Sequence, residues 1–123
     1  MKIRFTLHNN DFLLILQGIA VGFIVFGIIY GFGPLNVTND KWIMSGYDES
    51  DIIQHYAGWC AFRNSLWHFP LGLADNMGGG TYISFTDSIP WAAIFFKLIL
   101  QIVHYNGTFQ YFGIYTLFCY ILQ

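Results

Sequence analysis

Asp51 and His55 are the residues whose types and spacing most directly suggest chemistry. They stand four positions apart in the stretch DIIQHYAGWCAFRNSLWHFPLG, residues 51–72, whose pattern predicts a helix. Side chains four apart meet on a helix face, and a carboxylate beside an imidazole can act as a general base or bind a metal. Helix capping by Asp51 and interface polarity for His55 are the alternative, which the pair alone favours.

Two basic residues, Arg63 and Lys97, are candidates for binding a negatively charged group. Arg63 lies beside Trp59 and Trp67 at helical spacing, where it either snorkels to lipid headgroups with a cation–π contact or clamps a phosphate. Lys97 lies about 15 Å deep in an apolar helix, and a charge at that depth usually faces protein or a water-filled cavity. We therefore expect a buried partner for Lys97, supplied by the C-terminal part of a longer protein.

Asp87 is a second acidic candidate, followed by Ser88 and Pro90 in the order that suits the first turn of a helix. This order predicts that Asp87 caps the next helix at its outer end, and a functional acid is the alternative interpretation. Cys60 and Cys119 have neither the spacing of a metal site nor a CxxC motif. The cysteines therefore predict no metal centre.

The composition indicates that lipid surrounds the elements that position these residues. Charged residues make up 10% of the 123 residues and aromatic residues 20%, with a mean hydropathy of +0.49. A soluble protein carries about 25% charged residues to cover its surface. The net charge of −2, without a basic run, argues against nucleic acid as a partner.

Three apolar segments and one long polar segment predict an all-α membrane protein. Residues 12–32 carry no charge and can cross about 30 Å of hydrocarbon; a signal peptide, with a shorter apolar core and a cleavage site, is the alternative. The expected order is a cytoplasmic N-terminus 1–11, a first span 12–32, an external loop 33–88, a second span 89–105, a cytoplasmic turn 106–108 and a truncated third span 109–123. Because the third span stops without polar flanks, we expect the chain to be the N-terminal part of a longer protein.

The orientation follows from Lys2 and Arg4, because basic flanks of a first span stay on the cytoplasmic side. The long loop would then face the cell exterior or periplasm. Within the loop, residues 50–69 form an expected amphipathic helix whose tryptophan-containing face predicts a position in the membrane interface. Packing of that face on the C-terminal part of the longer protein is the alternative, and the two are compatible.

The order of several short motifs resembles the N-terminal region of a family of large, poorly characterised bacterial membrane proteins. The motifs are Asp51-x-x-Gln54-His55-Tyr56-x-Gly58-Trp59, Phe62-Arg63, Trp67-x-Phe69-Pro70-Leu71-Gly72, Thr86-Asp87-Ser88-Ile89-Pro90 and Phe96-Lys97. The resemblance covers roughly residues 12–105. That family looks related to the GT-C glycosyltransferases, which are polytopic helical enzymes that use polyprenyl-phosphate-linked sugars.

The resemblance implies a role for each candidate residue. GT-C enzymes carry interface-lying helices and an essential acid in the first external loop, and the matching acid here is Asp51. It would deprotonate an acceptor hydroxyl or bind a divalent metal ion, and His55 would assist it. Arg63 and Lys97 would bind the lipid phosphate, and Asp87 would be a second acid near the same outer surface. A divalent metal ion is the one cofactor that the resemblance suggests.

One function and one alternative follow from the resemblance. The expected function is that of an integral glycosyltransferase-like protein of the bacterial plasma membrane, which transfers sugar from a polyprenyl-phosphate donor on the outer face during cell-envelope glycan assembly. Its partners would be membrane lipid, the sugar donor, a glycan or lipid acceptor and the remaining C-terminal part of the same protein. The alternative is a non-catalytic transporter or assembly subunit for envelope glycans.

Overall fold

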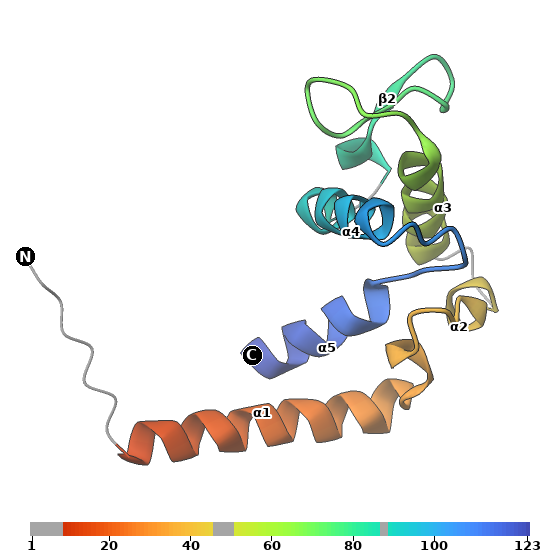
Figure 1. The fold of residues 1–123 in the computed structure, drawn as a ribbon. Coiled ribbons are helices and arrows are strands. Elements are labelled where there is room, and N and C mark those ends of the chain that lie inside the picture. Colours follow the sequence, from red (N-terminus) through yellow and green to blue (C-terminus); the bar gives the residue numbers. More distant parts are fainter. Residues whose placement is uncertain (1–8, 46–50, 87–88) are drawn as a thin grey trace, which may run out of the picture. The chain divides into compact units, whose positions relative to one another are not determined.

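The computed structural model describes residues 9–45, 51–86 and 89–123, and it is mostly helical, as the sequence predicts (Figure 1). The elements are α1 (Asn9–Tyr30), η1 (Gly33–Leu35), α2 (Lys41–Met44), α3 (Asp51–Asn64), β1 (Leu73–Ala74), β2 (Thr81–Tyr82), η2 (Ile83–Phe85), α4 (Pro90–Ile102) and α5 (Phe112–Leu122). The chain forms two compact units. One unit joins Met1–Asn36 to Phe112–Gln123, and the other is Val37–Tyr111.

Helix α1 corresponds to the predicted first span and exposes most of its apolar surface. Asp11 is its one charged residue, and no glycine or proline interrupts its hydrogen bonds before Gly31 takes a φ of 68°. Within the described residues, α1 is the one helix long and apolar enough to cross a membrane, and 11% of this stretch is buried. Such a helix needs a covering that the rest of its unit does not supply.

Helix α5 packs against α1 in the antiparallel direction. Near its start, Gly113 lies against the carbonyl of Pro34; near its end, the backbone of Tyr120 lies against Gly22. A Cβ on Gly22 would come within 2.5 Å of the Tyr120 carbonyl oxygen, so this glycine permits the close approach of the two helices. The chain therefore leaves and re-enters the helix pair at the same end.

This antiparallel pairing differs from the predicted order of spans. The sequence predicts a turn at 106–108 on the face opposite the long loop, which would make the third span parallel to the first. In the structure α5 begins at Phe112, three residues later than expected, because residues 109–111 are extended. The backbone N–H of Gln110 donates to the carbonyl of Val37 at 2.8 Å, which joins the two ends of the second unit.

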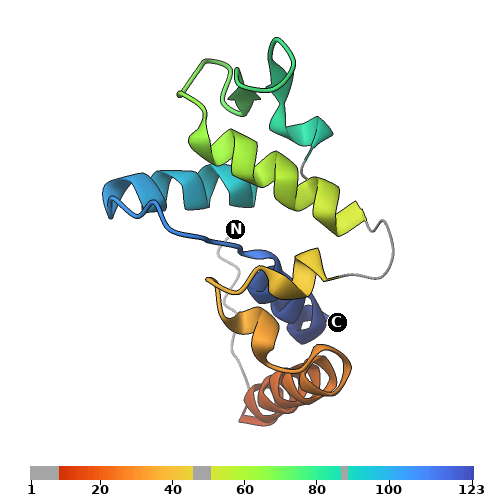
Figure 2. The ribbon, with the colours of Figure 1, turned by 90° about the vertical axis from the view of Figure 1, so that its right-hand side faces the viewer.

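Helices α3 and α4 lie side by side in the second unit, and residues 103–111 run back along them (Figure 2). Trp59 of α3 is fully buried against Phe109 and Tyr111, and Phe96 of α4 stacks on Tyr111 at a ring distance of 5.2 Å. The Trp59 indole N–H donates to the carbonyl of Phe109 at 2.9 Å. These aromatic contacts form the core of the unit.

Helix α3 is shorter than the predicted interface helix and is packed differently. It ends at Asn64, not at 69, because the Ser65 backbone N–H and hydroxyl both turn back to the carbonyl of Phe62, at 3.2 and 2.8 Å. The aromatic face that was expected in the membrane interface is covered by the chain itself: Trp59 is fully buried and Tyr56 is buried too. These two side chains therefore pack on other segments of this chain, a covering that the sequence did not predict.

Helix α4 is also shorter than the predicted second span. It ends at Ile102 instead of 105, and its 13 residues rise about 20 Å, less than the roughly 30 Å of a bilayer core. Ala93, Lys97 and Leu100 face the protein and are buried. The opposite face is exposed along its length and carries Trp91, Phe95, Leu98 and Ile102.

Candidate functional site

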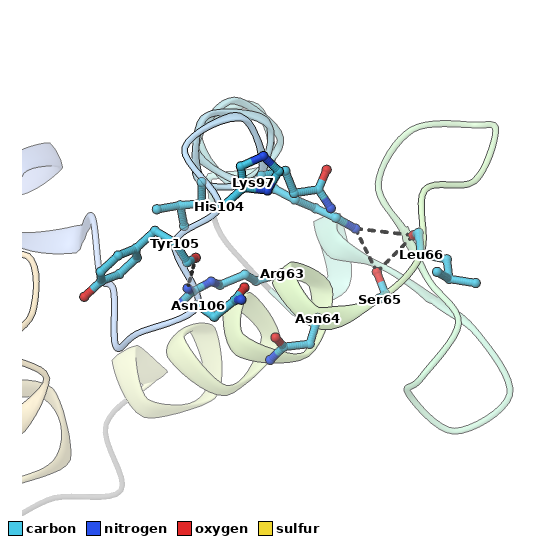
Figure 3. A pocket seen from close by; sticks show the side chains of 10 residues that line it. Arg63, Asn64, Ser65, Leu66, Lys97, His104, Tyr105 and Asn106 are labelled. Carbon is cyan, nitrogen blue, oxygen red and sulfur yellow. Dashed lines mark hydrogen bonds between the residues drawn. The ribbon is translucent and has the colours of Figure 1, made fainter.

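A pocket of about 450 Å³ opens in the second unit where the C-terminal ends of α3 and α4 meet (Figure 3). It is lined by residues of both helix ends and of the segments that follow them: Arg63, Asn64, Ser65, Leu66, Lys97, Leu100, Gln101, His104, Tyr105 and Asn106. Arg63 and Lys97, which the sequence singled out separately, therefore line the same space.

Lys97 is fully buried and is held by neutral groups of this chain. Its Nζ donates to the Ser65 hydroxyl at 3.0 Å and to the carbonyl of Leu66 at 3.3 Å. The same atom lies 4.2 and 4.5 Å from the ring centroids of Phe62 and Trp67, within cation–π range. The expected burial of Lys97 is confirmed, but the contacts come from α3 and the residues after it.

Arg63 approaches the pocket from the last turn of α3. Its Nη2 donates to the carbonyl of Tyr105 at 2.9 Å, and its guanidinium lies 5.8 Å from the ring centroid of the same tyrosine. One carbonyl uses one of the five N–H donors of a guanidinium. The side chain therefore keeps donors for a further acceptor, and it is only partly buried.

Gln101 and His104 belong to the pocket, although the sequence did not single them out. The Trp67 indole N–H donates to the Gln101 side-chain oxygen, so the amide NH₂ of Gln101 stays available. His104 has a φ of 53°, in the left-handed region that favours glycine. The nearest signal in the sequence is the Asn106-Gly107 turn, which marks the end of a helix without selecting His104.

The charges of the pocket suit an anion. Among the described residues, no carboxylate forms an ion pair with Arg63 or Lys97. The C-terminal ends of two helices bring partial negative charge, but the last carbonyls of α4 already accept hydrogen bonds from Val103, His104 and Tyr105. Guanidinium, ammonium and amide donors around one space are the groups that bind phosphate oxygens.

Asp51 and His55 lie at the other end of α3 and line no part of this pocket. Asp51 is exposed, whereas the Nδ1–H of the half-buried His55 donates to the carbonyl of Thr86 at 3.3 Å. No hydrogen bond or ion pair between Asp51 and His55 occurs in the described part of the chain, although their spacing led us to expect contact. Helical rise places Asp51 about 18 Å along the axis from Arg63.

This separation means that Asp51 and Arg63 do not serve one reacting centre in this arrangement. A base must come within hydrogen-bond reach of the acceptor hydroxyl, and that hydroxyl attacks the sugar carbon bonded to the phosphate oxygen. The two roles that the resemblance implies are thus held by opposite ends of one helix.

Among the described residues, none is placed to join Asp51 as a metal ligand. Across residues 9–45, 51–86 and 89–123, no group of three His, Cys, Asp or Glu side chains is placed to hold a metal ion. Asp87, the second predicted acid, lies outside the described residues. Burial raises the pKa of the Cys60 thiol, which disfavours the thiolate that binds metals.

Gly58 and Tyr56 explain how the N-terminal half of α3 is fixed. A Cβ on Gly58 would come within 2.5 Å of the Thr86 carbonyl oxygen, so only glycine allows Thr86 to approach and accept the His55 bond. The Tyr56 hydroxyl donates to Asp40 Oδ2 at 3.1 Å, and burial raises the pKa of Tyr56. The hydrogen bonds of His55 and Tyr56 therefore hold the N-terminal half of α3 in place.

Comparisons with known proteins give a family and no activity. The fold and the pocket define a helical protein with a long apolar helix and a basic site in a separate unit. Residues 19–123 match the family described as a domain of unknown function, DUF6311, so the chain belongs to that family. No curated protein and no solved structure matches the chain significantly.

Proposed function

We propose that the chain is the membrane-anchored N-terminal part of a glycosyltransferase-like protein that binds a polyprenyl-phosphate sugar donor on the outer face of the bacterial plasma membrane. The observation that carries this proposal is the shared pocket of Arg63 and Lys97. It gathers both residues that the GT-C resemblance assigns to the lipid phosphate. Among the described residues neither cation forms an ion pair, although the charge of Asp75 acts on Lys97.

The exposed apolar surface of α1 and α4 supports a membrane location. Helix α1 has the length and composition of a span, and its unit leaves most of it uncovered. The pairing of Gly22 with the α5 backbone is of the small-residue kind that suits helices in lipid. The outer face of α4, from Trp91 to Ile102, adds aromatic and aliphatic surface beside the pocket-lining residues.

The topology proposed here places the whole unit Val37–Tyr111 on one side of the membrane. Helices α1 and α5 run antiparallel, so the chain leaves and returns at the same end of the pair. With Lys2 and Arg4 holding the N-terminus in the cytoplasm, that end faces outward. Helix α4, which is too short to cross a bilayer core, then belongs to the external part of the chain.

The proposal is tested with the full-length protein in a strain that lacks its own copy, by incorporation of labelled sugar from polyprenyl-phosphate donors into envelope glycans. Arg63→Gln is expected to lower incorporation at least about tenfold, since a hydrogen bond to a charged group is lost. Lys41→Gln, which also replaces a cation by glutamine but at an exposed position of α2, is the matched control. Unchanged incorporation in Arg63→Gln at normal membrane levels would refute the proposal.

The separation of Asp51 from the pocket favours a second candidate, a non-catalytic transporter or assembly subunit that holds the lipid phosphate without transferring the sugar. Asp51→Asn distinguishes the two. Loss of incorporation in that variant would show that Asp51 takes part in the transfer and would contradict its separation from the donor site. Equal incorporation, together with loss in Arg63→Gln, would assign this chain to lipid-phosphate binding alone.

A further inference from the structure

His104 occupies a helix-ending position that usually requires glycine. The backbone N–H of Tyr105 donates to the carbonyl of Leu100 at 2.9 Å, and that of His104 donates to the carbonyl of Gln101 at 3.1 Å. This pair of bonds is the Schellman motif, whose left-handed residue is here His104, with a φ of 53°. Glycine takes this conformation without the steric conflict that a Cβ introduces.

The position of the His104 side chain suggests why the backbone takes this conformation. It lines the pocket that also contains Arg63 and Lys97 (Figure 3). In the described part of the chain, no hydrogen bond to the imidazole nitrogens is found, and the ring is exposed. The left-handed turn thus leaves an imidazole with an unused N–H donor among the residues that line the pocket, whereas glycine would end the helix equally well without a side chain there.

Two neighbours complete a set of donors around the same space. The Trp67 indole orients the Gln101 amide so that its NH₂ remains available. Asn106, two residues after His104, lines the pocket as well. The Schellman bonds occupy the carbonyls of Leu100 and Gln101, which would otherwise repel an anion.

We propose that His104 is a phosphate-binding residue of this pocket, held in a glycine-type conformation so that its imidazole N–H donates to an oxygen of the lipid phosphate beside Arg63. This inference rests on the proposed function and names a residue that the resemblance does not assign. Each phosphate oxygen accepts more than one hydrogen bond, so a donor beyond Arg63 improves the fit.

The test uses His104→Gly and His104→Asn in the full-length protein, reconstituted in phosphatidylcholine nanodiscs. The probes are farnesyl monophosphate, farnesol and inorganic phosphate, measured by direct titration and competition. His104→Gly is expected to raise the melting temperature, because the strain at the left-handed residue is relieved, and to weaken farnesyl monophosphate binding about tenfold. His104→Asn, which tolerates the same conformation, is expected to weaken binding as well.

The outcomes separate this inference from the proposed function. A more stable His104→Gly variant with weaker binding supports His104 as a ligand, because a purely structural role moves both quantities together. Wild-type affinity in His104→Gly, with loss in Arg63→Gln, overturns the role of His104 and leaves the phosphate site in place. Equal binding of farnesol and farnesyl monophosphate to the wild type refutes the phosphate site itself. Competition by inorganic phosphate at equal concentration would show that the lipid tail adds nothing to recognition.

Discussion

At its N-terminal end, α3 carries Asp51 and His55; at its C-terminal end, it brings Arg63 to a pocket that Lys97 shares. The N-terminal groups are either exposed or bonded to the chain, as His55 is to Thr86. The C-terminal groups are cations without carboxylate partners among the described residues. The comparison teaches that the residue pair with the most promising spacing does not share a pocket, whereas two basic residues chosen separately do.

Trp59 lies near the middle of α3, and its replacement should have the largest effect on stability. Its side chain is fully buried and packs on the segment 103–111 that follows α4. Trp59→Ala is expected to destabilise the unit by about 3–5 kcal/mol, because a large side chain leaves a cavity. Thermal unfolding of the full-length protein in detergent measures this loss. Trp59→Phe, which keeps a ring but loses the bond to Phe109, should cost only about 1 kcal/mol; equal losses in both variants would contradict the packing described.

Arg63→Gln and Asp51→Asn test the difference between the two ends directly. Binding of farnesyl monophosphate should fall at least about tenfold in Arg63→Gln, since a charge-assisted hydrogen bond is lost. Asp51→Asn should change it less than about twofold, because helical rise separates the two residues by about 18 Å. Isothermal titration in nanodiscs gives both values. A larger loss in Asp51→Asn would reverse the assignment of the two ends.

Gly58→Ala should disturb the N-terminal half of α3 alone. The added Cβ meets Thr86, so we expect a destabilisation of about 1–3 kcal/mol from overpacking. Ala57→Leu, an enlargement at the exposed neighbouring position, should stay within about 0.5 kcal/mol and serves as the control. At temperatures where the variant is folded, its phosphate affinity should match the wild type, and a tenfold loss would show that the two ends are coupled.

The exposed pair of His68 and Asp75 should give the smallest effect. The His68 Nε2–H donates to the Asp75 carboxylate at 2.9 Å and holds the pKa of that carboxyl below its ordinary value. The stabilisation is therefore present above the unfolded pKa, about 3.9, and is lost as the pH falls through the folded value. Melting temperatures of Asp75→Asn and wild type should differ slightly at pH 6 and converge toward pH 3. A difference that grows in acid would contradict this sign.

The sequence predicts helices well where local pattern decides, and less well where distant contacts do. Residues 12–32 form an unbroken apolar run, and the observed helix Asn9–Tyr30 follows it closely. The end of α3 depends on Ser65, whose hydroxyl bonds back to Phe62 and accepts from Lys97. No local signal announces such a contact, so the helix was predicted five residues too long.

The sequence identified the two basic residues of the candidate site but did not predict that they line one pocket. Arg63 and Lys97 stood out as charges in apolar surroundings, and both line the pocket. His104 was not singled out, because no local signal in the sequence predicts its left-handed φ. The antiparallel course of α5 was missed for a related reason: Phe109 and Tyr111 are fixed by Trp59, far away in the sequence.

The central claim, that a lipid phosphate binds at the C-terminal end of α3, is tested most directly by photo-crosslinking. The full-length protein in nanodiscs is irradiated with an isoprenyl monophosphate carrying a diazirine next to the phosphate, and the adducts are located by mass spectrometry. Adducts within residues 63–66 and 97–106, reduced by farnesyl monophosphate and not by farnesol, are the predicted result. Adducts around residues 51–55, or labelling that farnesol removes equally well, would contradict it.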